Sequence, residues 1–493
     1  MEKRYLLAID QGTTSSRAII FDREFNIVSV GQKEFSQIYP QAGWVEHNPE
    51  EIWESILSSI SDAISKASIK GEEIAAIGIT NQRETSFFWE KKTLKPLYNA
   101  IVWQCRRSSS ICNRLIQKGL QKKVRDKTGL VLDPYFSSTK IMWLFENHKD
   151  IKRVAEDGRL SFGTSDSFVL SRLTSNEVHA TDPSNASRTM LFNIKTLMWD
   201  KELLRIFKIP ESILPNVLPS AGIFGYTKGL SVLPDGIPIS GIAGDQQAAL
   251  FGQCCFDAGN TKITYGTGAF LLVNTGQKLK RSRYGLLSTV AWQIGDKVTY
   301  ALEGSVFIAG AVVQWLRDGL KIIERSSDVE RLINSVEDSN GVVVVPAFVG
   351  LGAPHWKKEA KGLIWGITRG TTAAHIARAA VESIALQSND VIEAMERDLG
   401  DKIRILRVDG GAAANDYLLS FQASISHKIV HRPRIVETTA MGAAMLSALG
   451  SNFIKDLKTL KENFIIEKEF KPSMKASVVK TIKSRWNEAI KRV

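Results

Sequence analysis

Two short segments of the chain carry residue types that could bind phosphate. The first, residues 10–17, places the carboxylate of Asp10 shortly before Gly12 and continues with hydroxyl and guanidinium side chains. These side chains are Thr13, Thr14, Ser15 and Arg17. A turn of this kind offers backbone N–H groups and hydroxyls to phosphate oxygens, and its acidic side chain can hold Mg²⁺ through water. The triplet Gly-Thr-Gly at 266–268 is a second such turn.

One turn of this composition is an ordinary feature of β-hairpins, in which Gly, Thr and Ser are common. Two of them favour a different interpretation, in which both turns contact the same phosphate chain. The chain has no Gly-x-x-x-x-Gly-Lys-Ser/Thr loop, which excludes a P-loop enzyme. The 266–268 triplet also lies between two predicted strands, whereas a dinucleotide fingerprint requires a following helix.

Residues 409–415, Asp-Gly-Gly-Ala-Ala-Ala-Asn, place small side chains where a predicted strand meets a predicted helix. Small residues at such a junction let a flat base or a ribose lie close to the backbone. Close packing of the helix on the sheet explains the same composition equally well. The segment therefore indicates a nucleoside site only in combination with the two turns.

The first turn is expected among short strands that are followed by a helix. Runs rich in Ile, Val and Phe predict strands over residues 4–9, 16–21, 27–35 and 74–80. Asn48 is a good N-cap and Pro49 suits the first helical position, so a helix is expected after residue 48. Glu51, three residues after Asn48, completes something close to a capping box.

The same order of elements returns in the second half of the chain. Strands are predicted over 261–265, 269–273, 298–302 and 403–408, and helices over 305–320 and 415–424. Two halves with matching strand-turn-strand openings predict an α/β protein with two related domains. Their boundary is expected near residues 244–252, and a ligand site is expected in the cleft between them.

Length and composition agree with this organisation. A chain of 493 residues with 44% hydrophobic content is too long for one core, so at least two domains are expected. It contains neither an apolar run of about 18 residues nor the pattern of a secretory signal at its start. The four cysteines lack zinc-ligand spacing, which favours a reducing cytoplasm. The net charge of +12 is scattered, so no nucleic-acid partner is expected.

The motifs as a set resemble the FGGY family of carbohydrate kinases, and the resemblance extends from residue 9 to about residue 448. The matching segments are 10–17, 43–47 (Gly-Trp-Val-Glu-His), 81–85 (Asn-Gln-Arg-Glu-Thr), 99–104, 133–136 (Asp-Pro-Tyr-Phe), 185–192, 241–252, 265–270, 350–354 and 409–415. The resemblance implies two ribonuclease-H-like domains of the actin and hexokinase type with a cleft between them. An N-terminal domain, 1–252, would hold the substrate pocket, and a C-terminal domain, 253–493, would bind the nucleotide.

The resemblance also implies ATP-dependent phosphorylation of glycerol to glycerol 3-phosphate. A pocket for this small polyol needs fixed donors and acceptors, since each buried hydroxyl left unpaired costs about 1–3 kcal/mol. The resemblance assigns Asp245 as the general base and as one of the groups that bind the hydroxyls. The other substrate residues that it implies are Arg83, Glu84, Tyr135 and Gln246, with Trp103 and Phe270 as apolar walls.

On the nucleotide side, the resemblance implies binding of ATP and Mg²⁺. Thr13, Thr14, Ser15, Arg17, Thr267 and Gly310 would lie near the phosphates, and Gln314, Gly411 and Asn415 near the nucleoside. Magnesium would be held largely by water and phosphate, with Asp10 and Asp245 contributing. A homo-oligomer, either a dimer or a tetramer, is implied in the same way.

Three alternatives stay open at the level of the sequence. The first is a kinase of this family that acts on another polyol or a ketose, against which Arg83, Glu84 and Tyr135 argue. The second is a chaperone or filament protein on the same fold, for which the chain offers no additional segment. The third is a kinase-like regulator without catalysis, which would be expected to lack Asp10 or Asp245.

Overall fold

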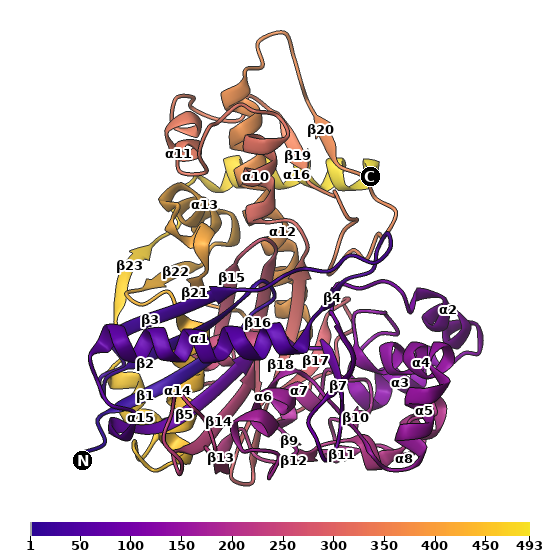
Figure 1. Ribbon diagram of the computed structural model, residues 1–493. Coiled ribbons are helices and arrows are strands. Elements are labelled where there is room, and N and C mark those ends of the chain that lie inside the picture. Colours follow the sequence, from indigo (N-terminus) through magenta and orange to yellow (C-terminus); the bar gives the residue numbers. More distant parts are fainter. Residues whose placement is uncertain (1) are drawn as a thin grey trace.

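A single sheet of 13 strands runs through the computed structural model, which describes residues 2–493 (Figure 1). In spatial order its strands are β23 (Ile466–Phe470), β22 (Ile429–Pro433), β21 (Ile405–Asp409), β15 (Thr261–Tyr265), β16 (Ala269–Gly276), β18 (Lys297–Val306), β17 (Leu287–Ile294), β13 (Ala221–Tyr226), β14 (Pro238–Gly244), β5 (Ile74–Asn81), β1 (Tyr5–Gln11), β2 (Ser15–Phe21) and β3 (Ile27–Glu34).

One arrangement of strands occurs twice in this sheet. β1 pairs antiparallel with β2 and parallel with β5, and β15 pairs antiparallel with β16 and parallel with β21. A third antiparallel strand extends each hairpin, β3 in the first unit and β18 in the second. The parallel side continues to β14 in one unit and to β22 in the other. The duplicated α/β pattern predicted from the sequence is therefore confirmed.

The helix predicted after residue 48 is α1 (Pro49–Ala67). The Asn48 side chain accepts a hydrogen bond from the backbone N–H of Glu50 at 3.0 Å, so the predicted cap is confirmed. The predicted capping box is wrong, because the Glu51 carboxylate accepts instead from the backbone N–H of Ser36 at 3.0 Å. That contact ties the start of α1 to the segment that follows β3.

The helix predicted over 305–320 begins later than expected. Residues 305 and 306 still belong to β18, where Ser305 pairs with Phe270 and Val306 with Ala269 of β16. Helix α10 covers only Gly310–Asp318. Pairing with β16 provides hydrogen-bond partners for the backbone at residues 305 and 306. These residues therefore form a strand, although the apolar side chains of the segment are spaced as in a helix.

Helices cover both faces of the large sheet, and an inserted region lies beside it (Figure 1). The insertion contains a four-stranded sheet with the order β4-β7-β6-β8. Its strands are β4 (Glu46–His47), β7 (Pro96–Ile101), β6 (Ser86–Glu90) and β8 (Leu160–Gly163). Its helices are α2 (Ser109–Gln117), α3 (Gln121–Thr128), α4 (Ser137–Asn147), α5 (Lys149–Glu156), α7 (Pro183–Ala186) and α8 (Lys201–Phe207). Helix α6 (Ser165–Leu173) packs between the two sheets, against β5 and β14 of the large one and β6 and β8 of the small one.

The helices of the second half are α9 (Asp245–Gly252), α10, α11 (Asp328–Ile333), α12 (Ala373–Leu399), α13 (Asp416–Ser426), α14 (Thr438–Gly450), α15 (Leu457–Glu462) and α16 (Ala476–Arg492). Figure 1 shows α10, α11 and α16 at the end of the molecule farthest from β13 and β14. In residues 2–493, no helix combines the length and the apolar character needed to cross a membrane.

Helices α9 and α14 approach each other very closely through glycine. A Cβ atom placed on Gly442 of α14 would lie 1.8 Å from the carbonyl oxygen of Ala248 in α9. A Cβ on Gly252 would likewise lie 2.0 Å from the carbonyl oxygen of Thr438. Since Asp245 is the first residue of α9, this contact fixes the position of a predicted site residue against the C-terminal half of the chain.

We predict that Gly442→Ala destabilises the protein, because the added methyl group must push α14 away from α9. Overpacking of this kind costs about 1–3 kcal/mol of the free energy of unfolding. Thermal unfolding followed by circular dichroism measures the effect. Gly222→Ala is the matched control, since a Cβ there meets no atom within 4 Å. Equal melting temperatures for the two variants would contradict the close helix contact.

Candidate active site

The first phosphate-type turn connects β1 to β2 and is a β-hairpin. Gly12 donates its backbone N–H to the carbonyl oxygen of Ser15 at 3.0 Å, which closes the turn. Thr13 and Ser15 are half-buried, and Thr14 is exposed. The hydroxyls predicted to face phosphate thus lie together at one end of the sheet.

Asp10 lies at the base of this hairpin, opposite Arg17 in the β1–β2 register. Arg17 Nη2 is 2.8 Å from Asp10 Oδ2, and Arg17 Nη1 is 2.6 Å from Glu437 Oε2. Burial raises the pKa of Asp10 despite the nearby Arg17 guanidinium, and the carboxylates of Glu437 and Asp245 add to the rise. The hairpin therefore brings a buried acid close to two further acids.

The three carboxylates of Asp10, Glu437 and Asp245 outnumber the one guanidinium group of Arg17, and this excess of negative charge suits a divalent cation. Within residues 2–493, no three His, Cys, Asp or Glu side chains are grouped so that they could hold a metal ion. Asp10, the buried acid at the base of the hairpin, suits a magnesium ion that would take its other ligands from water and phosphate oxygens.

Asp245 is the first residue of α9, directly after β14. Gly244, rather than Asp245, is the N-cap of this helix. Asp245 Oδ1 lies 2.9 Å from Arg83 Nε and accepts the backbone N–H of Gln246 at 2.7 Å. The carboxylate is held at one oxygen and is partly exposed, as a group that meets a substrate must be.

Arg83 and Glu84 follow β5 and belong to a buried chain of charged groups. Arg83 Nη1 lies 2.6 Å from Glu303 Oε2, and Arg83 Nη2 lies 3.2 Å from Glu303 Oε1. Arg188 Nη2 lies 3.0 Å from Glu303 Oε1, and Arg188 Nε lies 2.6 Å from Glu84 Oε1. The acids and arginines therefore alternate, in the order Glu84, Arg188, Glu303, Arg83, Asp245.

Burial and the charges of neighbouring side chains together set the protonation of the acids in this chain of charged groups. Burial favours the neutral form of Glu303, but Arg188 and Arg83 outweigh it and lower its pKa to about 2. Burial raises the pKa of Glu84 despite the same two arginines. Glu303 is thus the firmly ionised centre of the chain, and Glu84 is an acceptor that burial has made easier to protonate.

Trp103 and Tyr135 form an aromatic corner beside these charges. Their ring centroids are 5.5 Å apart at an interplanar angle of 86°. The Trp103 indole N–H donates to the Thr13 hydroxyl at 3.0 Å, so the corner also contacts the first hairpin. Burial raises the pKa of Tyr135, which keeps its phenol neutral and able to donate a hydrogen bond.

Phe270 and Gln246 are the remaining predicted substrate residues. Phe270 is half-buried on β16, where it pairs with Thr264 of β15 and Ser305 of β18. Gln246 is buried, and its side-chain oxygen accepts a hydrogen bond from Lys262 Nζ. Lys262 also donates to the Thr264 hydroxyl at 2.7 Å. Burial lowers the pKa of Lys262 to about 8, although Asp409 and Asp245 oppose the shift.

The second hairpin joins β15 to β16 and contacts the start of α10. Gly310 donates its N–H to the carbonyl oxygen of Gly266 at 2.9 Å, and Ala309 donates to that of Thr267 at 2.8 Å. The Thr267 residue is exposed, and Gln314 is exposed one helical turn after Gly310. The structure thus joins the second turn to the helix that carries two other predicted nucleotide residues.

The segment 409–415 follows β21 and lies against the same hairpin. Gly410 has a φ of +85°, and a Cβ on it would lie 2.6 Å from the carbonyl oxygen of Tyr265, so this close approach requires glycine. Gly411 is exposed, and a Cβ there would meet no atom within 4 Å. Asn415 caps α13 by accepting the N–H of Leu418 at 2.8 Å. Open space beside Gly411 suits a flat ligand.

Sequence reasoning missed three charged residues of this region, Arg188, Glu303 and Lys262. All three are fully buried. Glu303 lies in the buried part of β18, and Lys262 lies in the largely buried strand β15. A charged side chain inside a buried strand must have a partner, because an unpaired buried charge is very costly. That signal is present in the sequence, although it does not identify the partners.

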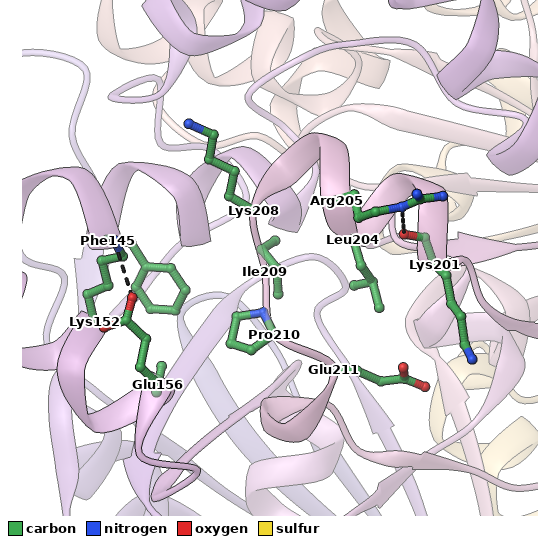
Figure 2. A pocket seen from close by; sticks show the side chains of 11 residues that line it. Phe145, Lys152, Glu156, Lys201, Leu204, Arg205, Lys208, Ile209, Pro210 and Glu211 are labelled. Atoms are coloured by element: carbon green, nitrogen blue, oxygen red, sulfur yellow. Dashed lines mark hydrogen bonds and ion pairs between the residues drawn. The ribbon is translucent and has the colours of Figure 1, made fainter.

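A surface hollow of about 750 Å³ lies apart from these residues, along α5, α8 and the segment after α8. Phe145, Leu204, Ile209 and Pro210 are among its apolar lining residues. Figure 2 shows the ion pair of Lys152 and Glu156, 3.3 Å long, at its edge. None of the residues predicted to bind substrate or nucleotide lines it.

Comparison with known proteins covers nearly the whole chain. Residues 5–252 match the N-terminal domain, and residues 261–451 the C-terminal domain, of the FGGY family of carbohydrate kinases. Glycerol kinase 2 of Thermotoga maritima is 55% identical over 489 residues, which cover 99% of this chain and 98% of that protein. Glycerol kinase of Carboxydothermus hydrogenoformans is 54% identical over 492 residues, covering 100% and 98%.

Solved structures give the same result for the fold. The crystal structure of Plasmodium falciparum glycerol kinase with ADP superposes with a TM-score of 0.93 at 36% identity, covering 100% of this chain and 98% of that one. Gluconate kinase of Lactobacillus acidophilus reaches 0.88 at 22% identity, covering 99% and 97%, which shows the shared fold alone. On the domain matches and the identity of its relatives, the chain belongs to the FGGY family of carbohydrate kinases, with the two-domain α/β fold of that family.

Proposed function

We propose that this protein phosphorylates glycerol, transferring the γ-phosphoryl group of ATP to one hydroxyl and yielding glycerol 3-phosphate. The observation that carries the proposal is the identity of 54–55% to glycerol kinases along practically the entire chain. The fold does not select the substrate by itself, since a gluconate kinase and xylulose kinases share it.

The residues around Arg83 support a pocket for a small polyol. Arg83 presents N–H donors, the carboxylates of Glu84 and Asp245 accept, and the Tyr135 phenol does either. Trp103, Tyr135 and Phe270 supply apolar surface for the C–H groups of the ligand. Buried donors and acceptors of this kind suit glycerol because each of its hydroxyls must find a partner.

The proposed chemistry centres on Asp245. Its Oδ1 is occupied by Arg83 and the Gln246 backbone, so we assign proton transfer to Oδ2. As the glycerol oxygen bonds to the γ-phosphorus and the bond to the ADP oxygen breaks, the hydroxyl proton passes to Asp245. Phosphoryl transfer needs mainly positioning and neutralised charge, which Arg83 and the surrounding network provide.

The two hairpins and the segment after β21 form the proposed nucleotide site. Thr13, Thr14, Ser15 and Arg17 would bind phosphate from one unit, and Thr267 and Gly310 from the other. Gln314, Gly411 and Asn415 would contact the nucleoside. Magnesium, when bound near Asp10 and Asp245, supplies charge neutralisation to the phosphates.

The same proposal assigns residues 1–252 and 253–493 to separate domains that enclose both substrates in a cleft. The two family matches end and begin on either side of that boundary. Closure of the domains over ATP and glycerol would exclude water, which otherwise competes as the phosphoryl acceptor.

We expect the purified protein, with Mg²⁺ and ATP, to release ADP rapidly in the presence of glycerol. A panel of other polyols and ketoses tests specificity in the same coupled assay. Turnover with xylulose or ribulose and none with glycerol would overturn the substrate assignment while keeping the family chemistry. No turnover with any compound would favour a regulator without catalysis.

We predict that Asp245→Asn lowers kcat by about 10²–10⁴-fold, the usual contribution of a general base. Binding of MgADP, measured by isothermal titration calorimetry, should be retained. Asp257→Asn is the matched control, because Asp257 is an exposed acid that pairs with Lys461 at 2.6 Å. An Asp245→Asn enzyme with at least half of the original kcat would exclude Asp245 as the base.

Gly411→Leu tests the nucleoside site separately. Because a Cβ at Gly411 meets no atom within 4 Å, we expect an unchanged melting temperature but a KM for ATP raised about tenfold or more. The KM for glycerol should stay within about twofold. Gly370→Leu, at another exposed glycine, serves as control. A normal KM for ATP in Gly411→Leu would place the nucleoside elsewhere.

A further inference from the structure

Glu303 lies at the centre of the large sheet, where a carboxylate is costly to bury. It belongs to β18 and pairs in register with Leu272 of β16 on one side and Leu287 of β17 on the other. Its side chain has no exposed surface. A buried carboxylate is tolerated only when hydrogen bonds and opposite charges replace the lost water.

Two arginines from the other half of the chain provide that replacement. Arg83 reaches Glu303 with both terminal nitrogens, at 2.6 and 3.2 Å, and Arg188 reaches it with one, at 3.0 Å. Both carboxylate oxygens are therefore used. Arg83 and Arg188 lie within the N-terminal family match, and Glu303 lies within the C-terminal one. The contact thus joins the two halves of the protein.

Apart from a hydrogen bond of Arg83 Nη1 to Gln247 Oε1 at 3.2 Å, the other polar contacts of these arginines lead to the substrate residues. Arg83 Nε lies 2.9 Å from Asp245 Oδ1, and Arg188 Nε lies 2.6 Å from Glu84 Oε1. A guanidinium group is planar and rigid, so fixing its terminal nitrogens also fixes the direction of its Nε–H. The position of one carboxylate, that of Glu303, thereby determines where Glu84 and Asp245 are held.

We propose that Glu303 is a positioning residue for substrate binding, which acts through Arg83 and Arg188 and does not itself touch the substrate. This inference rests on the proposed function, because it takes Arg83, Glu84 and Asp245 as the groups that bind the hydroxyls. The ionised state of Glu303, whose pKa the two arginines lower to about 2, agrees with that role.

The testing variant is Glu303→Gln, which keeps the shape of the side chain and removes its charge. We expect the KM for glycerol to rise at least about tenfold, because two guanidinium groups lose their common anchor. The KM for ATP should change by less than about threefold, since none of the residues proposed to contact the phosphates or the nucleoside belongs to this network. Stabilisation by MgADP in a thermal-shift assay verifies that the variant is folded.

Glu396→Gln is the matched control. Glu396 lies on α12 and also forms two ion pairs, with Lys402 Nζ at 3.0 Å and with Lys428 Nζ at 2.5 Å. It has no contact with the network around Glu303. Its KM for glycerol should stay within about twofold of the original value. A general loss of stability from removing a bridging carboxylate would appear in both variants, whereas loss of positioning would appear only in Glu303→Gln.

Glu303→Asp covers the case in which the glutamine variant does not fold. Aspartate keeps the charge and shortens its reach, so we expect a KM for glycerol between those of the original protein and Glu303→Gln. A folded Glu303→Gln or Glu303→Asp protein with an unchanged KM for glycerol would overturn the positioning role. If the original protein prefers another polyol, only the substrate assignment fails, and the same comparison is made with that polyol.

Discussion

The arrangement of the proposed substrate pocket depends on keeping charged side chains buried in the protein interior. Three carboxylates and two guanidinium groups alternate from Glu84 to Asp245, and four of these five side chains are almost completely buried. Each member is tolerable only because its neighbours are present, since removing one partner of a buried pair leaves an uncompensated charge. The network therefore selects one geometry, and the partly exposed Asp245 is where that geometry meets a ligand.

Duplication of the hairpin and its parallel strand explains why phosphate-type turns occur in both halves. In each unit the turn follows a central strand, β1 or β15, which is also paired to a parallel neighbour. The close glycine contact of α9 with α14 then ties Asp245 to a helix from the C-terminal part of the chain. Asp245 is therefore held both by its ion pair with Arg83 and by the packing of α9 against α14.

Local patterns allowed the strands, both turns and the Asn48 cap to be predicted, because they depend on residues that are neighbours in the sequence. The capping box predicted for Glu51 was wrong because its carboxylate accepts the backbone N–H of Ser36, in the segment after β3. The helix expected from residue 305 failed because pairing with β16 extends the strand. Glu303, Arg188 and Lys262 were missed since their partners lie far away in the chain. The family resemblance, rather than spacing, supplied the individual roles of the site residues, and those roles remain predictions.

The two sides of the proposed site differ in how they are built. Thr14, Thr267, Gln314 and Gly411 are exposed, whereas Arg83, Glu84 and Gln246 are buried. A nucleotide carries several charges and a large flat base, so turns and open backbone can bind it without a preformed enclosure. A three-carbon polyol offers few contacts, and a site for it must hold every donor and acceptor in place beforehand. A buried network anchored at Glu303 meets that requirement, because rigid charged partners leave few alternative positions for the hydroxyl-binding groups.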